Sequence, residues 1–328
     1  MNEERNTLMI AVGIDISKQK IDVWMNNKLT SLENNEKTIK KFFVPICRDG
    51  VKVVMEATGR YHRTAHSVLN ALGFDVMVIN PFQSRHFAKS MNIFCKTDKV
   101  DAKVLSQYAQ RMEFCKTPVL SKNEEDLQNL IRYLDDLKHL LIQHKNRLEF
   151  ASGITQKSLK RLIESTKIEM AVTTKAIEAL IQSDDNLAKR CEILTSIPGI
   201  GKATAAMLSG LLSELGSISN KEATALAGLA PMNCDSGKFT GKRHIQKGRH
   251  DVRRLLYIPT MGAATMHNSV LKNFYKKLIA AGKPPMVALV ACMRKLIVFA
   301  NTLLKKGEKW FFQPVMNELA FSETKVAA

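Results

Sequence analysis

Two aspartates stand three residues apart in the stretch CKTDKVDAK, residues 95 to 103. If this stretch is helical, Asp98 and Asp101 share one face and their carboxylates repel each other. Two more acids follow apolar runs of strand character, Asp15 in VGIDISK and Glu56 in VVMEATGRYH. Acids at strand ends of an α/β sheet commonly face the same crevice. We therefore expect these four carboxylates, from three separate elements, to meet in one pocket.

A pocket with four carboxylates is unfavourable when empty, because acids a few Å apart cannot all stay ionised. A hard divalent cation removes the conflict, and carboxylate oxygens suit Mg²⁺ or Mn²⁺. Two such ions would support phosphodiester chemistry. The alternative is purely structural: Asp15 ends a strand, Glu56 caps the next helix, and the later aspartates are first-turn acids after a Thr97 cap.

The segment LTSIPGIGKATAAMLSG, residues 194 to 210, joins an apolar stretch to a small-residue helix through Pro-Gly-Ile-Gly. It resembles the helix-hairpin-helix motif of DNA-binding proteins. Gly199 and Gly201 would let the backbone approach a phosphate, amides at the helix start would donate to it, and Lys202 would add charge. The alternative is a tight turn between two helices with no ligand.

A basic run follows in APMNCDSGKFTGKRHIQKGRHDVRRLLY, residues 230 to 257. Only Asp251 opposes its seven cations between residues 238 and 254. Such a run is typical of a surface that binds a phosphate backbone. The cations are Lys238, Lys242, Arg243, Lys247, Arg249, Arg253 and Arg254.

Ser236 stands just before Gly237 at the head of this basic run. A hydroxyl beside positive charge can attack a phosphate if a base or a metal-bound water takes its proton. The alternative is a plain Ser-Gly turn. Tyr257 is another hydroxyl in the segment, but its apolar helical surroundings favour packing.

The chain of 328 residues carries a net charge of +18, which indicates a polyanionic partner, most simply nucleic acid. Its six cysteines include no C-x-x-C pair, and we expect reduced thiols in a cytosolic setting. We expect neither a signal peptide nor a transmembrane helix. The apolar segment VALVACMRKLIVFANTLL is interrupted by Arg294 and Lys295 and predicts a packed amphipathic helix.

Three regions must position these residues. Residues 1–118 alternate short apolar runs with amphipathic stretches, and predict an α/β domain with a mixed sheet. Residues 119–185 begin with a Ser121/Glu124 capping box and carry leucines every seven residues, which predicts a helical hairpin or coiled-coil arm. Pairing within the chain and dimerisation fit that pattern equally well. Residues 186–328 predict a mostly helical third domain.

The same motifs, taken together, resemble the DEDD transposases of bacterial insertion elements, which are relatives of the Piv-type DNA invertases. The resemblance covers nearly the whole chain in the family's order. The segments that carry it are GIDISK, MEATGRYH, VINPFQSRHFAKS, KTDKVDA, SIPGIGKATAAML, LAGLAPMNCDSGKFTGKRHIQKG, VRRLLY and FYKKLIAAGKPPMVALVACMRKL.

The resemblance implies a RuvC-like, ribonuclease H-type domain whose tetrad Asp15, Glu56, Asp98 and Asp101 binds Mg²⁺. It also implies a C-terminal transposase domain in which Ser236 forms a covalent link to DNA. It further implies a structured guide RNA, a homodimer or homotetramer, and a cytoplasmic, nucleoid-associated protein without a membrane partner. PMNCDSGKFTGK has no second serine, so the assignment rests on one residue.

Two other functions remain open from the residues. In the first, the protein is a RuvC-like nuclease in which metal-activated water cuts the strand and Ser236 is a loop residue. In the second, it is a non-catalytic nucleic-acid-binding protein of the same fold.

Overall fold

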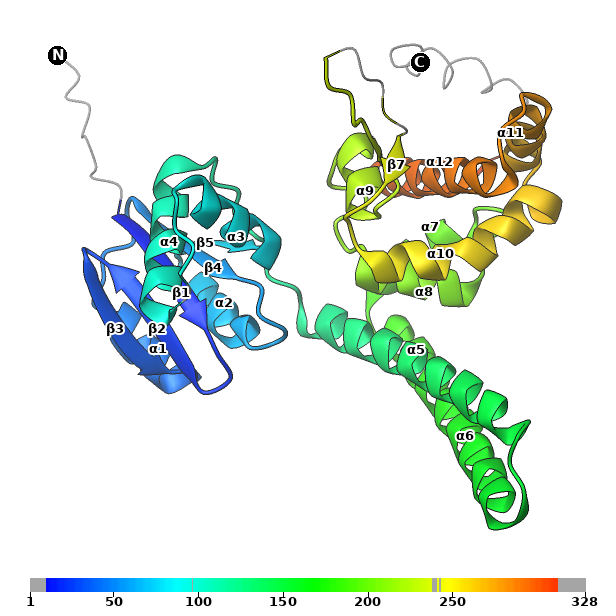
Figure 1. Cartoon of the computed structure of the whole chain (residues 1–328), viewed down its shortest axis with the longest axis horizontal. Helices are drawn as coiled ribbons and strands as arrows, with labels where there is room; N and C mark the ends of the chain where they lie inside the picture. The colour runs from blue at the N-terminus through cyan, green and yellow to red at the C-terminus, as the bar shows by residue number, and fades with distance from the viewer. Residues whose placement is uncertain (1–9, 96, 238–240, 242, 312–328) are drawn as a thin grey trace. The chain divides into compact units, whose positions relative to one another are not determined.

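The computed structural model describes residues 10–95, 97–237, 241 and 243–311. The chain divides into two compact units, Met1–Val119 and Leu120–Ala328, and each has its own hydrophobic core (Figure 1). The predicted arm of residues 119–185 falls almost wholly within the second unit. Its status as a separate domain stays a prediction.

The first unit is built on a five-stranded mixed sheet in the order β3-β2-β1-β4-β5. The central strand β1 pairs antiparallel with β2 and parallel with β4. The predicted strands are confirmed, including the segment KLTSLEN, which forms β3. The strand bounds are β1 Ile10–Ile16, β2 Lys20–Met25, β3 Lys28–Glu33, β4 Val51–Glu56 and β5 Asp75–Ile79.

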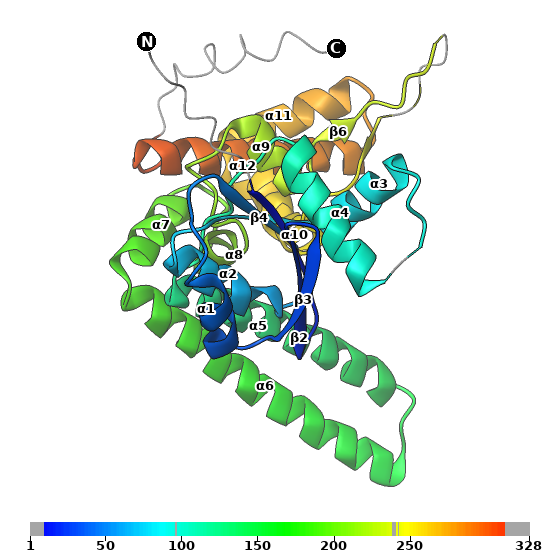
Figure 2. The same cartoon turned by 90° about the vertical axis from the view of Figure 1, so that its left-hand side faces the viewer.

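Four helices cover the two faces of this sheet, α1 and α2 on one face and α3 and α4 on the other (Figure 2). Polar caps set where three of them begin: Asn35 caps α1, Asn80 forms a capping box with Gln83 on α3, and Thr97 caps α4. The helix bounds are α1 Glu36–Phe43, α2 His62–Ala71, α3 Pro81–Ser90 and α4 Asp98–Arg111.

Side chains along β1 alternate between the two faces, as a strand requires. Val12, Ile14 and Ile16 pack into the core beneath α1 and α2. Ala11 packs into the smaller core beneath α3 and α4. Gly13 and Asp15 follow Ala11 at spacings of two, so the face that carries Asp15 is the one covered by α3 and α4.

Two long helices, α5 Lys122–Leu148 and α6 Gly153–Gln182, open the second unit and pack side by side as a hairpin (Figure 1). The predicted Ser121/Glu124 capping box is present. Leu127, Leu137 and Ile163 are buried. Pairing within the chain is therefore observed. Coiled-coil packing and association with a second copy stay predictions.

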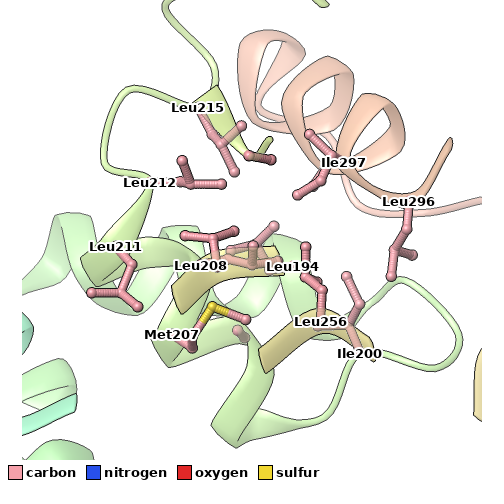
Figure 3. Packing of buried hydrophobic residues seen from close by; sticks show 14 of the residues in the cluster. Leu194, Ile200, Met207, Leu208, Leu211, Leu212, Leu215, Leu256, Leu296 and Ile297 are labelled. Atoms are coloured by element: carbon pink, nitrogen blue, oxygen red, sulfur yellow. The ribbon is translucent and has the colours of Figure 1, made fainter. Parts of the chain in front are cut away.

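Helices α7 to α12 form the rest of the second unit around one apolar core (Figure 3). Leu194, Leu208 and Leu256 come from three different helices and meet in it. The elements are α7 Asp185–Thr195, α8 Lys202–Leu211, α9 Asn220–Leu226, β6 Pro231–Met232, β7 His244–Ile245, α10 His250–Gly262, the π-helical turn η1 Ala263–His267, α11 Ser269–Ala280 and α12 Pro285–Lys306.

Within the part of the chain that the structure describes, α12 alone is long and apolar enough to cross a membrane. One of its faces is buried against the other helices of the second unit, where Cys292, Leu296 and Ile297 are fully enclosed. The predicted packed helix is therefore confirmed, and α12 is a core helix.

Candidate active site

A row of polar side chains crosses the sheet at the carboxyl end of β1. Asp15 on β1 is opposite Asp22 on β2, and Asp22 is in turn opposite Ser31 on β3. On the other side of Asp15, the parallel register of β1 and β4 places Glu56 next in line. Paired residues on neighbouring strands point to the same face of a sheet. The sheet therefore brings two predicted site acids together and adds a third, Asp22.

Helix α4 lies directly on β1, because Gly13 has no side chain. A Cβ built on Gly13 would lie 2.0 Å from the Ala102 carbonyl oxygen and 2.3 Å from the Ser106 nitrogen. One turn further along α4, the Ser106 hydroxyl donates to the Ala11 carbonyl at 2.9 Å. The helix thus runs opposite to β1, and its first turn, with the two predicted aspartates, reaches the end of β1.

Three of the predicted acids lie close enough to Asp15 to affect its ionisation. The pKa of Asp15 is raised from 3.8 to about 6, first by burial and then by the negative charges of Asp101, Asp98 and Glu56, against the lowering effect of the Ile16 amide. That amide donates to the Asp15 carboxylate at 3.0 Å. The structure therefore places Asp15, Glu56, Asp98 and Asp101 in one electrostatic cluster.

Ser84 on α3 holds Glu56 in place. Its hydroxyl lies 2.5 Å from Glu56 Oε2 and donates to it, and Ser84 itself is buried. Sequence reasoning missed this residue. The only signal was its position in the helix after β5, whose Asn80 capping box fixes where α3 begins.

Lys20 contacts two carboxylates at the same site. Its ammonium lies 2.9 Å from Asp22 Oδ2 and 3.6 Å from Asp98 Oδ2. Asp22 is buried, and its other oxygen accepts a hydrogen bond from Ser31. Sequence reasoning missed this group as well, although the alternation in KIDVW places Lys20 and Asp22 on one face of a strand.

The donor set suits a divalent metal, because it consists of carboxylate oxygens whose mutual repulsion a cation would relieve. Burial and that repulsion together raise the pKa of Asp15. Among the described residues, no three His, Cys, Asp or Glu side chains converge closely enough to hold an ion. Asp98 is paired with Lys20 instead. The chemistry of the residues therefore fits Mg²⁺ or Mn²⁺, and metal binding requires their side chains to close in.

Ser236 lies in the second unit, on the loop that joins β6 to β7. The residue is exposed, and Gly237 after it has a positive φ of 57°. The Gly241 amide donates to the Asp235 carboxylate at 3.1 Å, which ties the two sides of the loop together. The loop thus presents the Ser236 hydroxyl to solvent. Its role as nucleophile stays a prediction.

The predicted glycine turn lies between α7 and α8. Gly199 has a φ of +97°, and a Cβ there would lie 2.3 Å from Ala263 Cβ, so the turn packs tightly against η1. Gly201 caps α8 and faces open space, with nothing near a built Cβ. Gly199 therefore has a packing role, while Gly201 and Lys202 remain available for a phosphate. The helix-hairpin-helix assignment stays a prediction.

Three of the predicted nucleic-acid-binding arginines make contacts within the second unit. Arg249 forms a two-pronged ion pair with Glu214 on the loop after α8. Arg253 donates to the Gly228 and Lys247 carbonyls, each at 3.1 Å. Arg254 pairs with Asp135 on α5. These contacts give all three a structural role that a charge run does not reveal.

The rest of the predicted basic surface differs in accessibility. Arg243 is exposed, and Lys247 lies in the turn before α10 with a positive φ of 62°. Lys238 and Lys242 lie outside the described residues. Lys202, Arg253 and Arg254 line one groove of about 1390 Å³ between the hairpin and the helical core of the second unit. The groove brings together cations from two separate predicted motifs.

Two family models match this chain, and together they cover most of it. Residues 12–151 match a DEDD-type model described as a transposase. Residues 191–276 match the model described as the Transposase IS116/IS110/IS902 family. The chain belongs to this transposase family.

Two curated relatives of the transposase extend the match. The transposase is 27% identical over 315 residues to the pilin gene-inverting protein of Moraxella bovis. This alignment covers 90% of the chain and 96% of the relative. It is 27% identical over 312 residues to the protein of the same name from Moraxella lacunata, again covering 90% and 96%. The transposase thus aligns with nearly the full length of both.

The predicted site residues fall in two separate matched regions of the transposase. The acidic cluster lies within residues 12–151 and Ser236 lies within residues 191–276. A transposase acts on DNA, which agrees with the net charge of +18. The mixed α/β sheet followed by a mostly helical remainder fits a RuvC-like DEDD transposase.

Proposed function

We propose that this transposase cuts and rejoins DNA with a divalent metal held by Asp15, Glu56, Asp98 and Asp101 and with Ser236 as the nucleophile. The observation that carries the proposal is that acids from β1, β4 and α4 lie near the same end of the sheet, where Asp101, Asp98 and Glu56 add to the effect of burial in raising the pKa of Asp15 to about 6. A partly buried carboxylate with other carboxylates beside it is a candidate functional group.

The metal, Mg²⁺ or Mn²⁺, would supply positive charge beside the scissile phosphate. The protein's own residues prepare that position. Ser84 orients the Glu56 carboxylate, the Ile16 amide orients that of Asp15, and the close contact at Gly13 places the first turn of α4. Residues that hold ligands in place in this way raise metal affinity.

Ser236 would act by transesterification. Its oxygen forms a bond to phosphorus, a phosphorus–oxygen bond of the DNA backbone breaks, and the released sugar oxygen takes up a proton. Attack by the hydroxyl of another DNA end then restores a phosphodiester and returns the proton to Ser236. No bond energy is lost to water, which suits an enzyme that rejoins strands. The exposed position of Ser236, on the same β6–β7 segment as the exposed cation of Arg243, supports this role.

We also propose a structured guide RNA as a partner, which the resemblance to the DEDD transposases implies and with which the net charge of +18 is compatible. A homodimer or homotetramer would allow the acidic cluster of one subunit to act with Ser236 of another. The name of the relatives describes inversion of a pilin gene, and inversion requires the same cutting and rejoining. We place this activity in the cytoplasm, at the nucleoid.

The test is the fate of DNA with Ser236→Ala, with Ser217→Ala as a matched control at another exposed serine of the same unit. We expect Ser236→Ala to bind DNA normally but to form no covalent protein–DNA adduct, while Ser217→Ala forms it. Strand cleavage that persists in Ser236→Ala would replace the proposal with a nuclease that uses water.

A second pair of substitutions tests the acidic cluster. The double variant Asp15→Asn with Asp101→Asn should lose Mg²⁺-dependent cleavage and adduct formation and keep DNA binding. Unchanged activity would leave the four acids without a catalytic role. The absence of any Mg²⁺-dependent change in DNA with the unsubstituted protein would reduce the chain to a nucleic-acid-binding protein.

A further inference from the structure

Lys20 bridges a buried carboxylate and an exposed one at the acidic cluster. Its ammonium lies 2.9 Å from Oδ2 of Asp22, whose side chain is 4% exposed. It lies 3.6 Å from Oδ2 of Asp98, whose side chain is 69% exposed. The shorter contact is thus to the buried partner, and the longer one is to an acid of the proposed metal site.

The Asp22 end of this bridge is fixed by the fold. A buried carboxylate requires a countercharge and hydrogen bonds, because removing it from water is expensive. Ser31, its partner across the β2–β3 pair, donates to one oxygen, and Lys20, two residues earlier on the same face of β2, takes the other. Sheet register therefore sets where the Lys20 ammonium lies.

The Asp98 end is weaker and can be exchanged. Asp98 is the first residue of α4, in water, and its contact with Lys20 is at long ion-pair distance. Exposed pairs of this kind contribute ~0–1 kcal/mol. A divalent ion that binds Asp98 would replace this contact, while Lys20 keeps its short contact with Asp22.

We propose that Lys20, anchored on Asp22, is the built-in countercation of the acidic cluster and competes with the divalent metal for Asp98. This inference rests on the proposed metal site. It makes Lys20 and Asp22 a pair that sets metal affinity, without either being a metal ligand. In the metal-free protein Lys20 also contacts the first turn of α4 through Asp98.

The experiment is Mn²⁺ binding to the full-length protein, measured by electron paramagnetic resonance of the free ion. Lys20→Gln removes the charge but leaves an amide that can donate to Asp22. Lys18→Gln is the matched control, because it removes the same charge from an exposed position in the bend just before β2. Lys20→Gln with Asp22→Asn keeps the net charge unchanged and leaves no buried carboxylate unpaired.

We expect Lys20→Gln to bind Mn²⁺ about 2- to 5-fold more tightly than Lys18→Gln, the range that corresponds to an exposed ion pair. The double variant should also bind more tightly than the unsubstituted protein, although its net charge is the same. Its melting temperature in EDTA provides a check that the first unit is folded.

The outcomes separate the inference from the proposed function. If the unsubstituted protein binds Mn²⁺ and Asp15→Asn abolishes binding, the metal site stands. In that case equal or weaker binding by both Lys20 variants overturns the competition alone. If the unsubstituted protein and Asp15→Asn bind Mn²⁺ equally poorly, the metal site itself fails, and the inference fails with it.

Discussion

Gly13 on β1 and Ala102 on α4 are in direct backbone contact. A single methyl group on Gly13 would lie 2.0 Å from the Ala102 carbonyl oxygen, closer than any real contact allows. This approach brings the first turn of α4, with Asp98 and Asp101, to the end of β1 where Asp15 lies. The acidic cluster therefore depends on the absence of a side chain two residues before its central acid.

Gly13→Ala should force α4 away from the sheet. We expect a loss of about 1–3 kcal/mol in the free energy of unfolding of the first unit, typical of overpacking, and weaker Mn²⁺ binding. Urea unfolding, followed by hydrogen exchange of β1 peptides, measures the first effect. Gly262→Ala is the control, because its added methyl has its nearest neighbour at 3.8 Å. Equal stability of the two variants would refute the close contact.

Asp15→Asn should stabilise the metal-free first unit at pH 7.5. The pKa of Asp15 is raised from 3.8 to about 6, so the folded state holds a proton that the unfolded state has lost between these values. Stability therefore falls as pH rises through that window, and it stays lower above it. Melting temperatures in EDTA should favour Asp15→Asn at pH 7.5 and converge with the unsubstituted protein below pH ~4. A less stable Asp15→Asn at pH 7.5 would contradict the raised pKa of Asp15.

The sequence was sufficient to predict which elements carry the four acids, because each acid lies at the end of a strand or at the start of a helix that can be recognised from the sequence. Asp15 and Glu56 end apolar strands, and Thr97 caps the helix that carries the other two. The mixed sheet and the long hairpin also followed from periodicity. The sequence did not indicate which side chains that lie far apart in the chain contact each other in the fold. Ser84 meets Glu56 across 28 residues, and that contact depends on tertiary packing.

In the basic run, the sequence predicted phosphate binding for arginines that the fold pairs with acids elsewhere in the chain. Seven cations in a short segment predict a surface that binds phosphate, and composition alone gives no reason to separate them. The structure pairs Arg249 with Glu214 and Arg254 with Asp135, acids 35 and 119 residues away. A charge run reveals the presence of cations but not the carboxylates that the fold brings to them.

Arg249→Ala should therefore destabilise the second unit. The arginine donates to both Glu214 oxygens and, at 2.7 Å, to the Leu211 carbonyl. Burial raises the pKa of Glu214, but Arg249 outweighs it and holds the pKa below its usual value. Removing Arg249 leaves a half-buried carboxylate unpaired, and we expect a loss of about 1–3 kcal/mol, smaller than for a fully buried pair. Chemical denaturation of the full chain measures it, and a change under 0.5 kcal/mol, about that of a surface substitution, would contradict the structural role.

Arg243→Ala, unlike Arg249→Ala, should leave stability unchanged and weaken DNA binding. Arg243 is exposed on the basic loop, so its loss should remove the predicted phosphate contact without disturbing the core. We expect the slope of log affinity against log salt to fall by about one and all DNA sequences to lose affinity equally. Lys283→Ala, at an exposed position between α11 and α12, is the control for loss of one charge. A loss confined to particular sequences would indicate base contacts instead.

Ser84→Ala should weaken metal binding without unfolding the first unit. The Ser84 hydroxyl is 2.5 Å from Glu56 Oε2, and its loss frees a carboxylate that the proposed site needs in a fixed orientation. Substitutions of residues that orient metal ligands lower affinity by about 10- to 100-fold. Mn²⁺ titration measures this, with Ser90→Ala on the same helix as the control, since its hydroxyl donates only to the Phe87 carbonyl. If Ser84→Ala binds Mn²⁺ as tightly as Ser90→Ala while both melt at the same temperature in EDTA, Glu56 does not depend on Ser84 for its position.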